Sequence, residues 1–415
     1  MAKAKDPILI IGGGRAAASF VDAYREAGGE ALITIVSADA SPPYNRPPLS
    51  KGVLRGEMEP DGSLVHEAEE YDDLVVELRL DTTVESVDPA AHTVQLAGGE
   101  SLQYGTLVIA SGAHPRHLSS VPGGDLPAVR TFRTLADAVA VAQEAPEARK
   151  ILVVGGSFIG SEVAASLRMR GLDVTLVEQG DHLVPALASE ELSDQVADLY
   201  REHGVELLLG EQIQEFRANG RSLTGAVTAS GQEIEAFLAV VGVGVEPETG
   251  FLEGSGLELD NGIVVDDHFQ ASAEDIYAIG DVARFDDTVA RRPRRIEHWS
   301  NADNQGRYLG TALAGGGRTA YAEVSVFFTK MFDLQLQVLG DPGAGVDEVV
   351  IRGSIADRNL LAFHLHEDRL VGAVVVGQGE DLVEELKVLL REQPEIGDRS
   401  RLGNEHIRPK AVFAA

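Results

Sequence analysis

A strand, a glycine-rich turn, a helix and a second strand occur in this order twice, and this repeat restricts the fold more than any other feature. The first copy runs from the apolar residues Ile8–Ile11 through "GGGRAA" and a helix to the strand "ALITIVS". The second is "KILVVGGSFIGSEVAASLRMRGLDVTLVE", residues 150–178. An apolar strand that runs directly into such a turn is typical of a βαβ unit with parallel strands. Two units predict two nucleotide sites.

The chain changes character beyond about residue 320. Short alternating segments such as "LQLQVLG" and "LLAFHLHEDRLVGAVVV" predict antiparallel strands, with Glu367 and Asp368 near a hairpin turn. A helix is predicted in "EDLVEELKVLLREQP", ended by Pro394. Its apolar face comprises Leu382, Val383, Leu386, Leu389 and Leu390. With 415 residues the chain is too long for one core, and we expect this part to form a separate α+β domain.

Composition excludes several kinds of chemistry and partner. The sequence contains no cysteine, which excludes disulfides, thiolate-bound clusters and a redox-active CxxC pair, so that redox work requires a bound cofactor; we expect no metal site. A net charge of -31 disfavours nucleic acid and anionic lipid. No apolar stretch reaches the roughly 18 residues of a membrane span, which predicts a cytoplasmic protein without membrane contact.

The first glycine turn has the spacing of a dinucleotide-binding motif. Gly12, Gly14 and Ala17 occupy the G-x-G-x-x-G/A positions. The first glycine permits the tight turn, the second lets the backbone approach a pyrophosphate, and the small third residue lets the helix pack on the strand. Asp39 is the candidate acid for a ribose, although it lies 25 residues after Gly14 rather than about 20.

The second turn differs at its middle position. It contains Gly155, Ser157 and Gly160, so that a serine with its Cβ replaces the second glycine and would hold a pyrophosphate slightly further out. Glu178 ends the next strand, 18 residues after Gly160, where a carboxylate binds ribose hydroxyls and repels a 2′-phosphate. Residues 179–181 offer no arginine for such a phosphate. The second site therefore favours NADH over NADPH.

Taken together, several motifs resemble those of a known group of flavoproteins. "LVIASGAHPR" at 107–116 and "IYAIGD" at 276–281, with the two turns, resemble the flavoprotein reductases that bind two dinucleotides. "PPYNRPPLSK" at 42–51 and "RIEHWSNADNQG" at 295–306 look like the oxygenase-coupled NADH-dependent ferredoxin reductases, the putidaredoxin and rubredoxin reductase group. The C-terminal "DEVVIRG" and the strands after it are also similar to that group.

The resemblance implies a glutathione-reductase-like α/β fold with two Rossmann-like domains and a C-terminal α+β domain. FAD would occupy the first site and NADH the second, in an NAD domain inserted between two segments of the FAD domain. The expected boundaries are 1–115 and 243–320 for the FAD-binding segments, 116–242 for the NAD-binding domain and 321–415 for the C-terminal domain.

The same resemblance assigns roles to individual residues. Lys51 matches a lysine beside the reactive nitrogen N5 of the flavin, Glu162 a glutamate near the nicotinamide, and Trp299 a tryptophan near the exposed flavin edge. We expect these three to be catalytic, with Lys51 and Trp299 also contacting cofactor. Asp281 matches an aspartate that binds the ribityl chain of the flavin, and Arg46 a position near the cofactor. Further cofactor-binding positions are Ala110, Gly112, Gly244, Gly280 and His298.

The implied function is transfer of electrons from NADH through FAD to a ferredoxin or rubredoxin that serves a cytochrome P450 or a ring-hydroxylating oxygenase. Without cysteine, electrons cannot leave through an internal disulfide. Two alternatives are an NADH oxidase or small-acceptor reductase, and a redox sensor that resembles apoptosis-inducing factor. A monomer and a homodimer are both compatible with the sequence.

Four arginines in "RRPRRIEHW" at 291–299 form a basic cluster in this acidic chain. Arg291, Arg292, Arg294 and Arg295 could attract an acidic ferredoxin, because distant charges are screened beyond about 8 Å at physiological salt. Alternatively, they pair internally with acids such as Asp281, Asp286 or Asp287. The chain also departs from the family pattern in "FFTKMFD" at 327–333, where a tryptophan-serine-aspartate run is common, and at Glu248, where asparagine is common.

Overall fold

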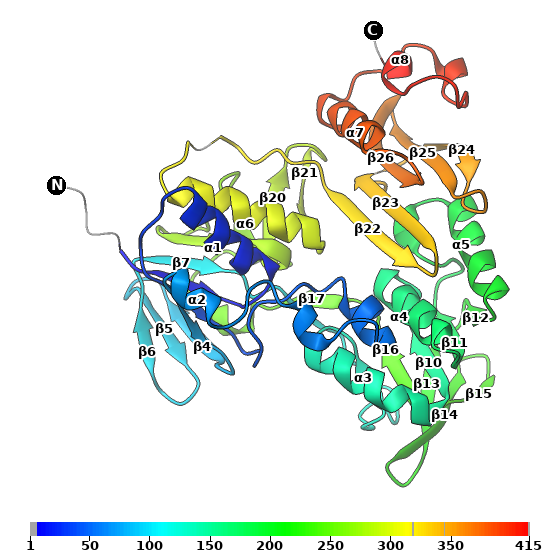
Figure 1. Ribbon diagram of the computed structural model, residues 1–415, viewed down its shortest axis with the longest axis horizontal. Coiled ribbons are helices and arrows are strands. Elements are labelled where there is room, and N and C mark those ends of the chain that lie inside the picture. Colours follow the sequence, from blue (N-terminus) through cyan, green and yellow to red (C-terminus); the bar gives the residue numbers. More distant parts are fainter. Residues whose placement is uncertain (1–5, 318, 344, 414–415) are drawn as a thin grey trace. The chain divides into compact units, whose positions relative to one another are not determined.

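The computed structural model describes residues 6–317, 319–343 and 345–413 (Figure 1). Two compact units are present. Unit 1 comprises Met1–Arg46, Pro60–His114 and Val245–Glu323, and unit 2 comprises Pro47–Glu59, Pro115–Gly244 and Val324–Ala415. Each unit therefore contains segments that are far apart in the sequence.

Unit 1 contains a parallel sheet of five strands in the order β19-β7-β1-β2-β3. Its strands are β1 (Ile8–Ile11), β2 (Ile33–Val36), β3 (Val76–Arg79), β7 (Thr106–Ile109) and β19 (Ile276–Ala278). The chain builds the sheet outward from β1 on one side, through β2 and β3, and on the other through β7 and β19. The strand order therefore reverses between β1 and β7, and ligands of open α/β sheets bind beyond the carboxyl ends of the strands at such a point.

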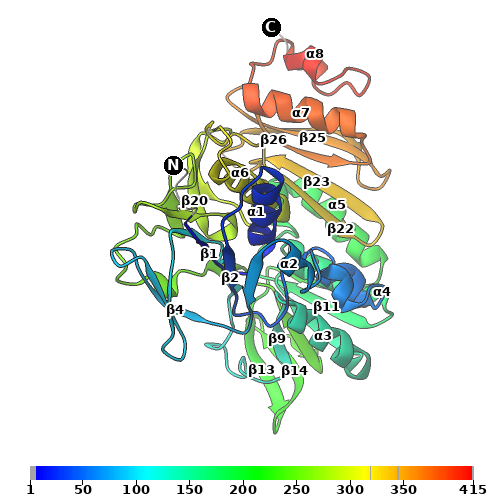
Figure 2. The ribbon, with the colours of Figure 1, turned by 60° about the vertical axis from the view of Figure 1, so that its left-hand side comes forward.

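Helices α1 (Arg15–Glu26) and α6 (Trp299–Leu313) of unit 1 lie side by side in Figures 1 and 2. Two glycines one turn apart on α6 allow this close approach. A Cβ built on Gly306 would lie 2.4 Å from the carbonyl oxygen of Ala16, and one on Gly310 would lie 2.4 Å from that of Phe20. The two helix backbones are therefore in direct contact. A short helix, α2 (Glu70–Asp73), precedes β3.

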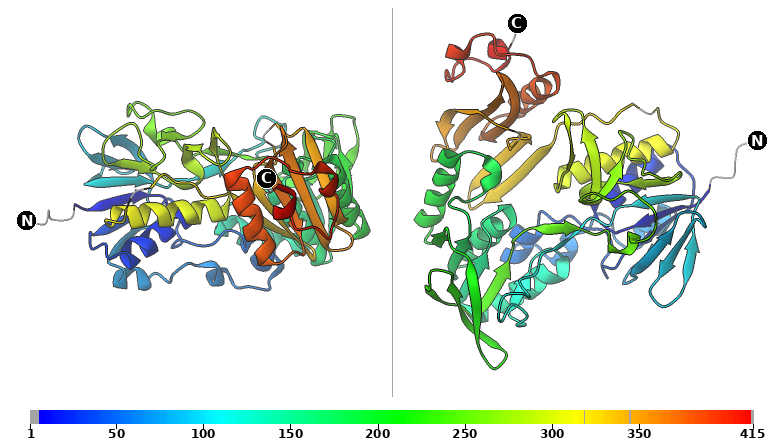
Figure 3. Two further views of the ribbon diagram at one scale, coloured as in Figure 1. Left: turned by 90° about the horizontal axis from the view of Figure 1, so that it is seen from above. Right: turned by 180° about the vertical axis from the view of Figure 1, so that it is seen from behind.

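Three small sheets complete the described part of unit 1 (Figure 3). One is an antiparallel meander of β4 (Val84–Asp88), β5 (Thr93–Leu96) and β6 (Ser101–Gln103). The second contains β18 (Ile263–Val265), β20 (Ala283–Asp287) and β21 (Arg292–Arg295). The third pairs β8 (Ala113–Pro115) with β17 (Val245–Pro247), where the chain leaves unit 1 and returns to it.

Unit 2 contains a second parallel sheet with the same kind of strand order, β12-β11-β10-β16-β9. Its strands are β9 (Val129–Thr131), β10 (Lys150–Val154), β11 (Asp173–Glu178), β12 (Glu206–Leu209) and β16 (Leu238–Val241). The helices of this part are α3 (Leu135–Ala148), α4 (Phe158–Met169) and α5 (Glu190–Glu202). An antiparallel sheet of β13 (Ile213–Asn219), β14 (Ser222–Thr228) and β15 (Glu233–Glu235) is also present. Here the strand order reverses between β10 and β16.

The C-terminal part of unit 2 is an antiparallel sheet in the order β22-β23-β26-β25-β24, with α7 (Glu380–Glu392) packed on it (Figure 3). Its strands are β22 (Val326–Met331), β23 (Leu334–Gly340), β24 (Glu348–Ser354), β25 (Asn359–His366) and β26 (Arg369–Val376). The loop between β25 and β26 has positive φ at Glu367 (48°) and Asp368 (60°), as a two-residue type I′ turn requires. A short helix, α8 (Lys410–Phe413), follows α7.

The expected fold class is confirmed: two parallel dinucleotide-binding sheets and a C-terminal antiparallel sheet with a helix. The hairpin at Glu367 and Asp368 and the helix before Pro394 are present as predicted. Leu386, Leu389 and Leu390 of α7 are buried. Across the described residues, every helix is too short or too polar to traverse a lipid bilayer.

Candidate cofactor sites and a buried ion pair

The first glycine turn lies at the point in unit 1 where the strand order reverses. Gly12 has φ +108°, and a Cβ there would lie 2.2 Å from the carbonyl oxygen of Ala110, which follows the neighbouring strand β7. Gly14 is the N-cap of α1; no side chain caps the helix at this residue, and a Cβ on it would meet no protein atom within 4 Å. Ala17 is completely buried. The start of α1 thus has no side-chain cap and leaves open space at Gly14, as an anion site at a helix N-terminus requires.

The other predicted residues of unit 1 gather at the same edge of the sheet. Asp39 follows β2; its Oδ2 accepts a hydrogen bond from the Tyr44 hydroxyl at 2.6 Å and its Oδ1 one from the Ser41 amide at 3.1 Å. Gly280 and Asp281 follow β19, with Asp281 only 9% exposed. Because the registers place Ile11 beside Val36 and Ile109, and Ile109 beside Ala278, these strands end at one level. Ala110 and Gly112 lie there too.

Trp299, the first residue of α6, is fixed by contacts on two sides. Its indole N–H donates to Asn45 Oδ1 at 2.9 Å, and the guanidinium carbon of Arg15 lies 4.9 Å from its ring centroid. Arg15 in turn donates from Nη2 to Asp303 Oδ1 at 2.7 Å. Arg15 directly follows the first glycine turn, so the turn, the tryptophan and α6 form one network. Sequence reasoning missed Arg15 because its partners lie nearly three hundred residues away.

The four arginines of the basic cluster differ in their exposure to solvent. Arg294 pairs with the buried carboxylate of Asp287 at 2.6 Å. Arg295 pairs with Glu297 at 2.6 Å and donates to the carbonyl of Asp281 at 2.8 Å. Arg291 and Arg292 are exposed. The internal alternative therefore describes Arg294 and Arg295.

His298 lies half-buried immediately before Trp299. Burial lowers the pKa of His298 to about 4, although the carboxylate of Asp281 acts in the opposite direction. The imidazole is therefore neutral at neutral pH. It can donate from one ring nitrogen and accept at the other.

Two further predicted positions lie where the chain passes between segments. Arg46 is half-buried and is the last residue of the first segment of unit 1. Gly244, in unit 2, has φ +98° with open space at its Cβ position, and its carbonyl accepts the amide of Arg116 at 3.0 Å. In unit 1, Glu248 has a definite structural role: its Oε2 lies 2.8 Å from Nδ1 of His114, and its amide donates to the carbonyl of Gly112 at 3.0 Å.

The second turn repeats the construction of the first within unit 2. Gly155 has φ +105°, and a Cβ there would lie 2.3 Å from the carbonyl of Gly242, which follows the adjacent strand β16. A Cβ on Gly160 would lie 1.9 Å from the carbonyl of Gly155. Ser157 is the N-cap of α4 but does not cap it with its side chain. The amides of this helix start therefore also remain available to a phosphate.

Glu178 closes the second turn from the neighbouring strand β11. Its Oε2 accepts the amide of Gly156 at 2.5 Å and its Oε1 accepts that of Gly180 at 2.8 Å. A carboxylate offers about four lone-pair sites, so capacity for ribose hydroxyls remains. The carboxylate thus lies at the edge of the sheet where the sequence predicts the ribose.

Lys51 and Glu162 form a buried ion pair in unit 2. Lys51 Nζ lies 2.6 Å from Glu162 Oε1, and the two side chains are 15% and 3% exposed. Lys51 belongs to a short π-helical turn, Leu49–Val53, and its ammonium group also donates to the carbonyl of Pro47 at 3.2 Å. π-helical turns often occur at functional sites. The structure brings together two residues that are more than one hundred positions apart in the sequence.

Ser50 and Thr329 complete this site and were missed in the sequence. Ser50 Oγ donates to Glu162 Oε2 at 2.5 Å, and Thr329 Oγ1 donates to Glu162 Oε1 at 2.6 Å. Ser50 adjoins Lys51 in the motif at 42–51, a signal that could have identified it. Thr329 lies in the departing segment "FFTKMFD", and nothing local marks its contact with Glu162.

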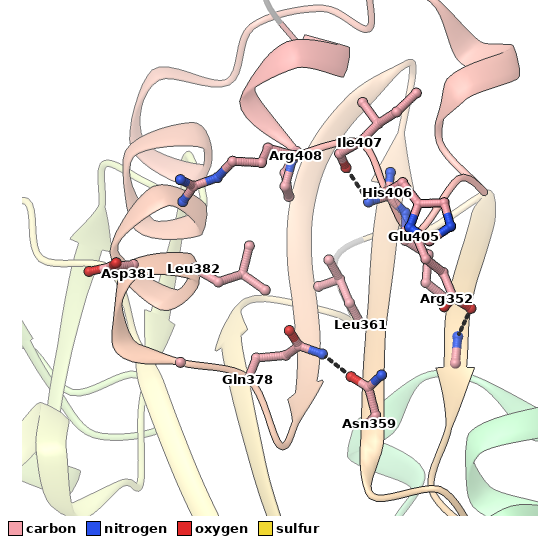
Figure 4. A pocket seen from close by; sticks show the side chains of 13 residues that line it. Arg352, Asn359, Leu361, Gln378, Asp381, Leu382, Glu405, His406, Ile407 and Arg408 are labelled. Atoms are coloured by element: carbon pink, nitrogen blue, oxygen red, sulfur yellow. Dashed lines mark hydrogen bonds between the residues drawn. The ribbon is translucent and has the colours of Figure 1, made fainter.

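A polar cavity of about 500 Å³ lies elsewhere, in the C-terminal part (Figure 4). Its buried arginine, Arg352, donates to the carbonyls of Leu402, Ile407 and Arg401, and its amides Asn359 and Gln378 bond to each other. Through these bonds Arg352 ties residues 401–407 to strand β24.

Both turns fit a dinucleotide. In each, a glycine with positive φ leaves no room for a Cβ against the adjacent strand, and the helix N-terminus that follows is not capped by a side chain. Phosphate recognition needs close backbone approach and free amides at a helix start. Both requirements are met twice, once in each unit.

Comparisons with known proteins agree with this geometry. Residues 6–306 match the family described as "Pyridine nucleotide-disulphide oxidoreductase", and residues 326–410 match "Reductase C-terminal". The chain is 34% identical to rhodocoxin reductase of Rhodococcus erythropolis, over 93% of this chain and 90% of that protein. It is 35% identical to the 5,5'-dehydrodivanillate O-demethylase ferredoxin reductase subunit of a Sphingobium species, over 98% of each.

Among solved structures, the chain is similar to the reductase in the covalent putidaredoxin reductase-putidaredoxin complex. The TM-score is 0.93 with 28% identity, over 99% of each chain. The resemblance inferred from sequence motifs is thereby confirmed.

Proposed function

Because the chain belongs to the pyridine nucleotide-disulphide oxidoreductase family, we propose that it oxidises NADH and passes the electrons to a ferredoxin that serves an oxygenase. It is an FAD- and NAD(H)-dependent oxidoreductase. The observation that carries the proposal is the pair of dinucleotide turns in a chain without cysteine. Because the chain has no thiol that could accept the electrons, they must pass from the flavin to an external acceptor, which we propose is a one-electron carrier protein.

The cofactor-binding residues of unit 1 would hold FAD. The amides that follow Gly12 and Gly14 would receive the pyrophosphate, and Asp39 and Asp281 would accept hydrogen bonds from sugar or ribityl hydroxyls. Bound FAD supplies the ability to accept a hydride and to release electrons singly. We assign further contacts with the cofactor to Ala17, Arg46, Ala110, Gly112, Gly280, His298 and Trp299.

The cofactor-binding residues of unit 2 would hold NADH. Gly155, Ser157 and Gly160 would shape the phosphate site, and Glu178 would bind the adenosine ribose. Gly244 follows the carboxyl end of β16. Lys51 would supply a positive charge that stabilises the negative charge developing on a reduced flavin, and Glu162 would hold that lysine in position. We assign the domains as 1–115 and 243–320 for FAD, 116–242 for NAD and 321–415 for the C-terminal part, and the compartment as cytoplasm.

A ferredoxin partner would approach a locally basic surface. The docking charge would come from the basic cluster at 291–295, in which Arg291 and Arg292 are exposed to solvent. An acidic partner would otherwise be repelled by a chain of net charge -31. Reversal of both exposed charges should slow ferredoxin reduction at low salt and leave ferricyanide reduction unchanged.

The test is an anaerobic titration of the purified yellow protein with NADH, followed by rapid mixing with a panel of ferredoxins. Bleaching of the flavin by one equivalent of NADH and fast reduction of at least one ferredoxin are expected. Rapid reoxidation by oxygen or quinone, with no ferredoxin reduced, would instead identify a small-acceptor reductase. Slow reoxidation with NADH-induced dimerisation would identify a redox sensor.

A further inference from the structure

The carboxylate of Glu162 receives hydrogen bonds from separate segments of unit 2. Its side chain is 3% exposed; Oε2 accepts from Ser50 Oγ at 2.5 Å, and Oε1 accepts from Lys51 Nζ and Thr329 Oγ1, each at 2.6 Å. A carboxylate removed from water is costly unless charged or hydrogen-bonding groups replace the water. The three donors therefore determine how this carboxylate is oriented.

Thr329 reaches Glu162 from the C-terminal sheet, where it lies on strand β22 and is 1% exposed. Next to it, the ring of Phe327 packs on the ring of Phe158 with a centroid distance of 4.1 Å. This contact holds β22 against the first turn of α4, the helix that carries Glu162. Threonine is stiff at χ1, so the hydroxyl is presented from a fixed position.

We propose that Thr329 is a positioning residue for flavin reduction, acting through Glu162 on the ammonium group of Lys51. Thr329 and Lys51 donate to the same oxygen, Oε1, so the threonine fixes the point at which the lysine is held. The proposal rests on the proposed function, which assigns Lys51 to the chemistry of the flavin. Its new content is that the C-terminal sheet supplies a group to that chemistry.

The decisive substitution is Thr329→Val, which keeps the shape of the side chain and removes the donor. Oε1 then retains only the ammonium group of Lys51 as a donor, and the carboxylate gains rotational freedom. A charged group stabilises a transition state less well when the hydrogen bonds that hold it in position are removed. The rate constant for anaerobic flavin reduction by NADH should fall about tenfold, the equivalent of one hydrogen bond to a charged group. The dissociation constant of NADH should stay within about twofold.

The conservative variant and a matched control separate positioning from general packing. Thr329→Ser restores the hydroxyl and should recover the rate to within about threefold. Thr228 is a buried threonine of β14 in the same unit, whose hydroxyl bonds to Ser230 Oγ at 3.0 Å. Thr228→Val makes the same chemical change away from Glu162 and should leave the rate constant and the flavin potential at their wild-type values.

A second variant keeps the proposal testable if Thr329→Val does not fold. Ser50→Ala removes the donor to the other oxygen. Like Thr329→Val, it should slow flavin reduction and lower the midpoint potential of the flavin. Wild-type kinetics and potential in folded Thr329→Val or Ser50→Ala would overturn the proposal, as would a loss in Thr329→Ser equal to that in Thr329→Val. Failure of the proposed function shows separately, as wild-type protein that NADH does not reduce or that reduces no ferredoxin.

Discussion

Gly14→Ala should weaken FAD binding without unfolding the protein. Gly14 has φ -93° and ψ -173°, an extended conformation that alanine adopts readily, and the new Cβ would meet no protein atom within 4 Å. The space that the methyl group enters is the space assigned to the pyrophosphate. The substitution thus alters the space assigned to the ligand and leaves the contacts between the turn and the rest of the protein unchanged.

The magnitude follows from two small opposing effects on protein stability and one larger effect on FAD binding. Alanine is a poorer N-cap than glycine by up to about 1 kcal/mol, and it gains roughly 0.4–1 kcal/mol by restricting the unfolded chain. The stability of the protein without FAD should therefore change by less than about 1 kcal/mol. Displacing one phosphate oxygen from an amide costs about 1.5–3 kcal/mol, which corresponds to an FAD complex weaker by about 10- to 150-fold.

The assay combines a thermal melt of the deflavinated protein with a titration by FAD, followed through the loss of flavin fluorescence. Gly12→Ala is the contrasting variant, because its Cβ would lie 2.2 Å from the Ala110 carbonyl at a φ of +108°. That variant should lose stability before any ligand is added. FAD affinity equal to wild type in a folded Gly14→Ala protein would refute the placement of the pyrophosphate at this turn.

Other substitutions test the remaining parts of the structure. Ser157→Gly removes the Cβ from the second turn and should tighten NADH binding about fivefold, roughly 1 kcal/mol, as measured by the NADH dependence of flavin reduction; looser binding would contradict the spacing inferred there. Glu178→Gln should reduce the preference for NADH over NADPH about tenfold, compared through kcat/KM. Gly310→Ala should destabilise unit 1 by about 1–3 kcal/mol in urea, because its Cβ would lie 2.4 Å from a backbone oxygen of α1. Burial lowers the pKa of His364 to about 4, below its value of about 6.5 in the unfolded chain, so the free energy of unfolding should fall as the pH falls from 6.5 towards 4. Between pH 7 and pH 5 the loss should be about 2 kcal/mol, measured by urea unfolding. His364→Gln should not show this pH-dependent loss.

Local patterns in the sequence predict the elements that local forces determine. The apolar run Ile8–Ile11 is strand β1, and the segment from Lys150 to Glu178 is β10, α4 and β11 with the expected ends. In these segments strand propensity, a glycine turn and helix periodicity all favour the same structure. The carboxyl edges of two parallel sheets then place Gly12, Gly155 and Glu178 where the motifs predict.

Contacts between distant segments were beyond local patterns. Ser50 and Thr329 lie 112 and 167 residues from Glu162, and no periodicity relates them. Arg294 likewise pairs with Asp287 because β20 and β21 are antiparallel neighbours, which a count of charges does not reveal. Such contacts depend on tertiary packing, and a resemblance identifies only those that relatives share.

The backbone contact between α1 and α6 has a consequence for protein engineering. With glycine at 306 and 310, the backbones of α1 and α6 are in contact, so the start of α6 at Trp299 and the glycine turn before α1 belong to one closely packed helix pair. Substitutions around Trp299 that are selected for a new electron acceptor would therefore also disturb the glycine turn before α1, where we place FAD. Redesign of acceptor choice is therefore best directed at surface charge, with this pair of helices left intact.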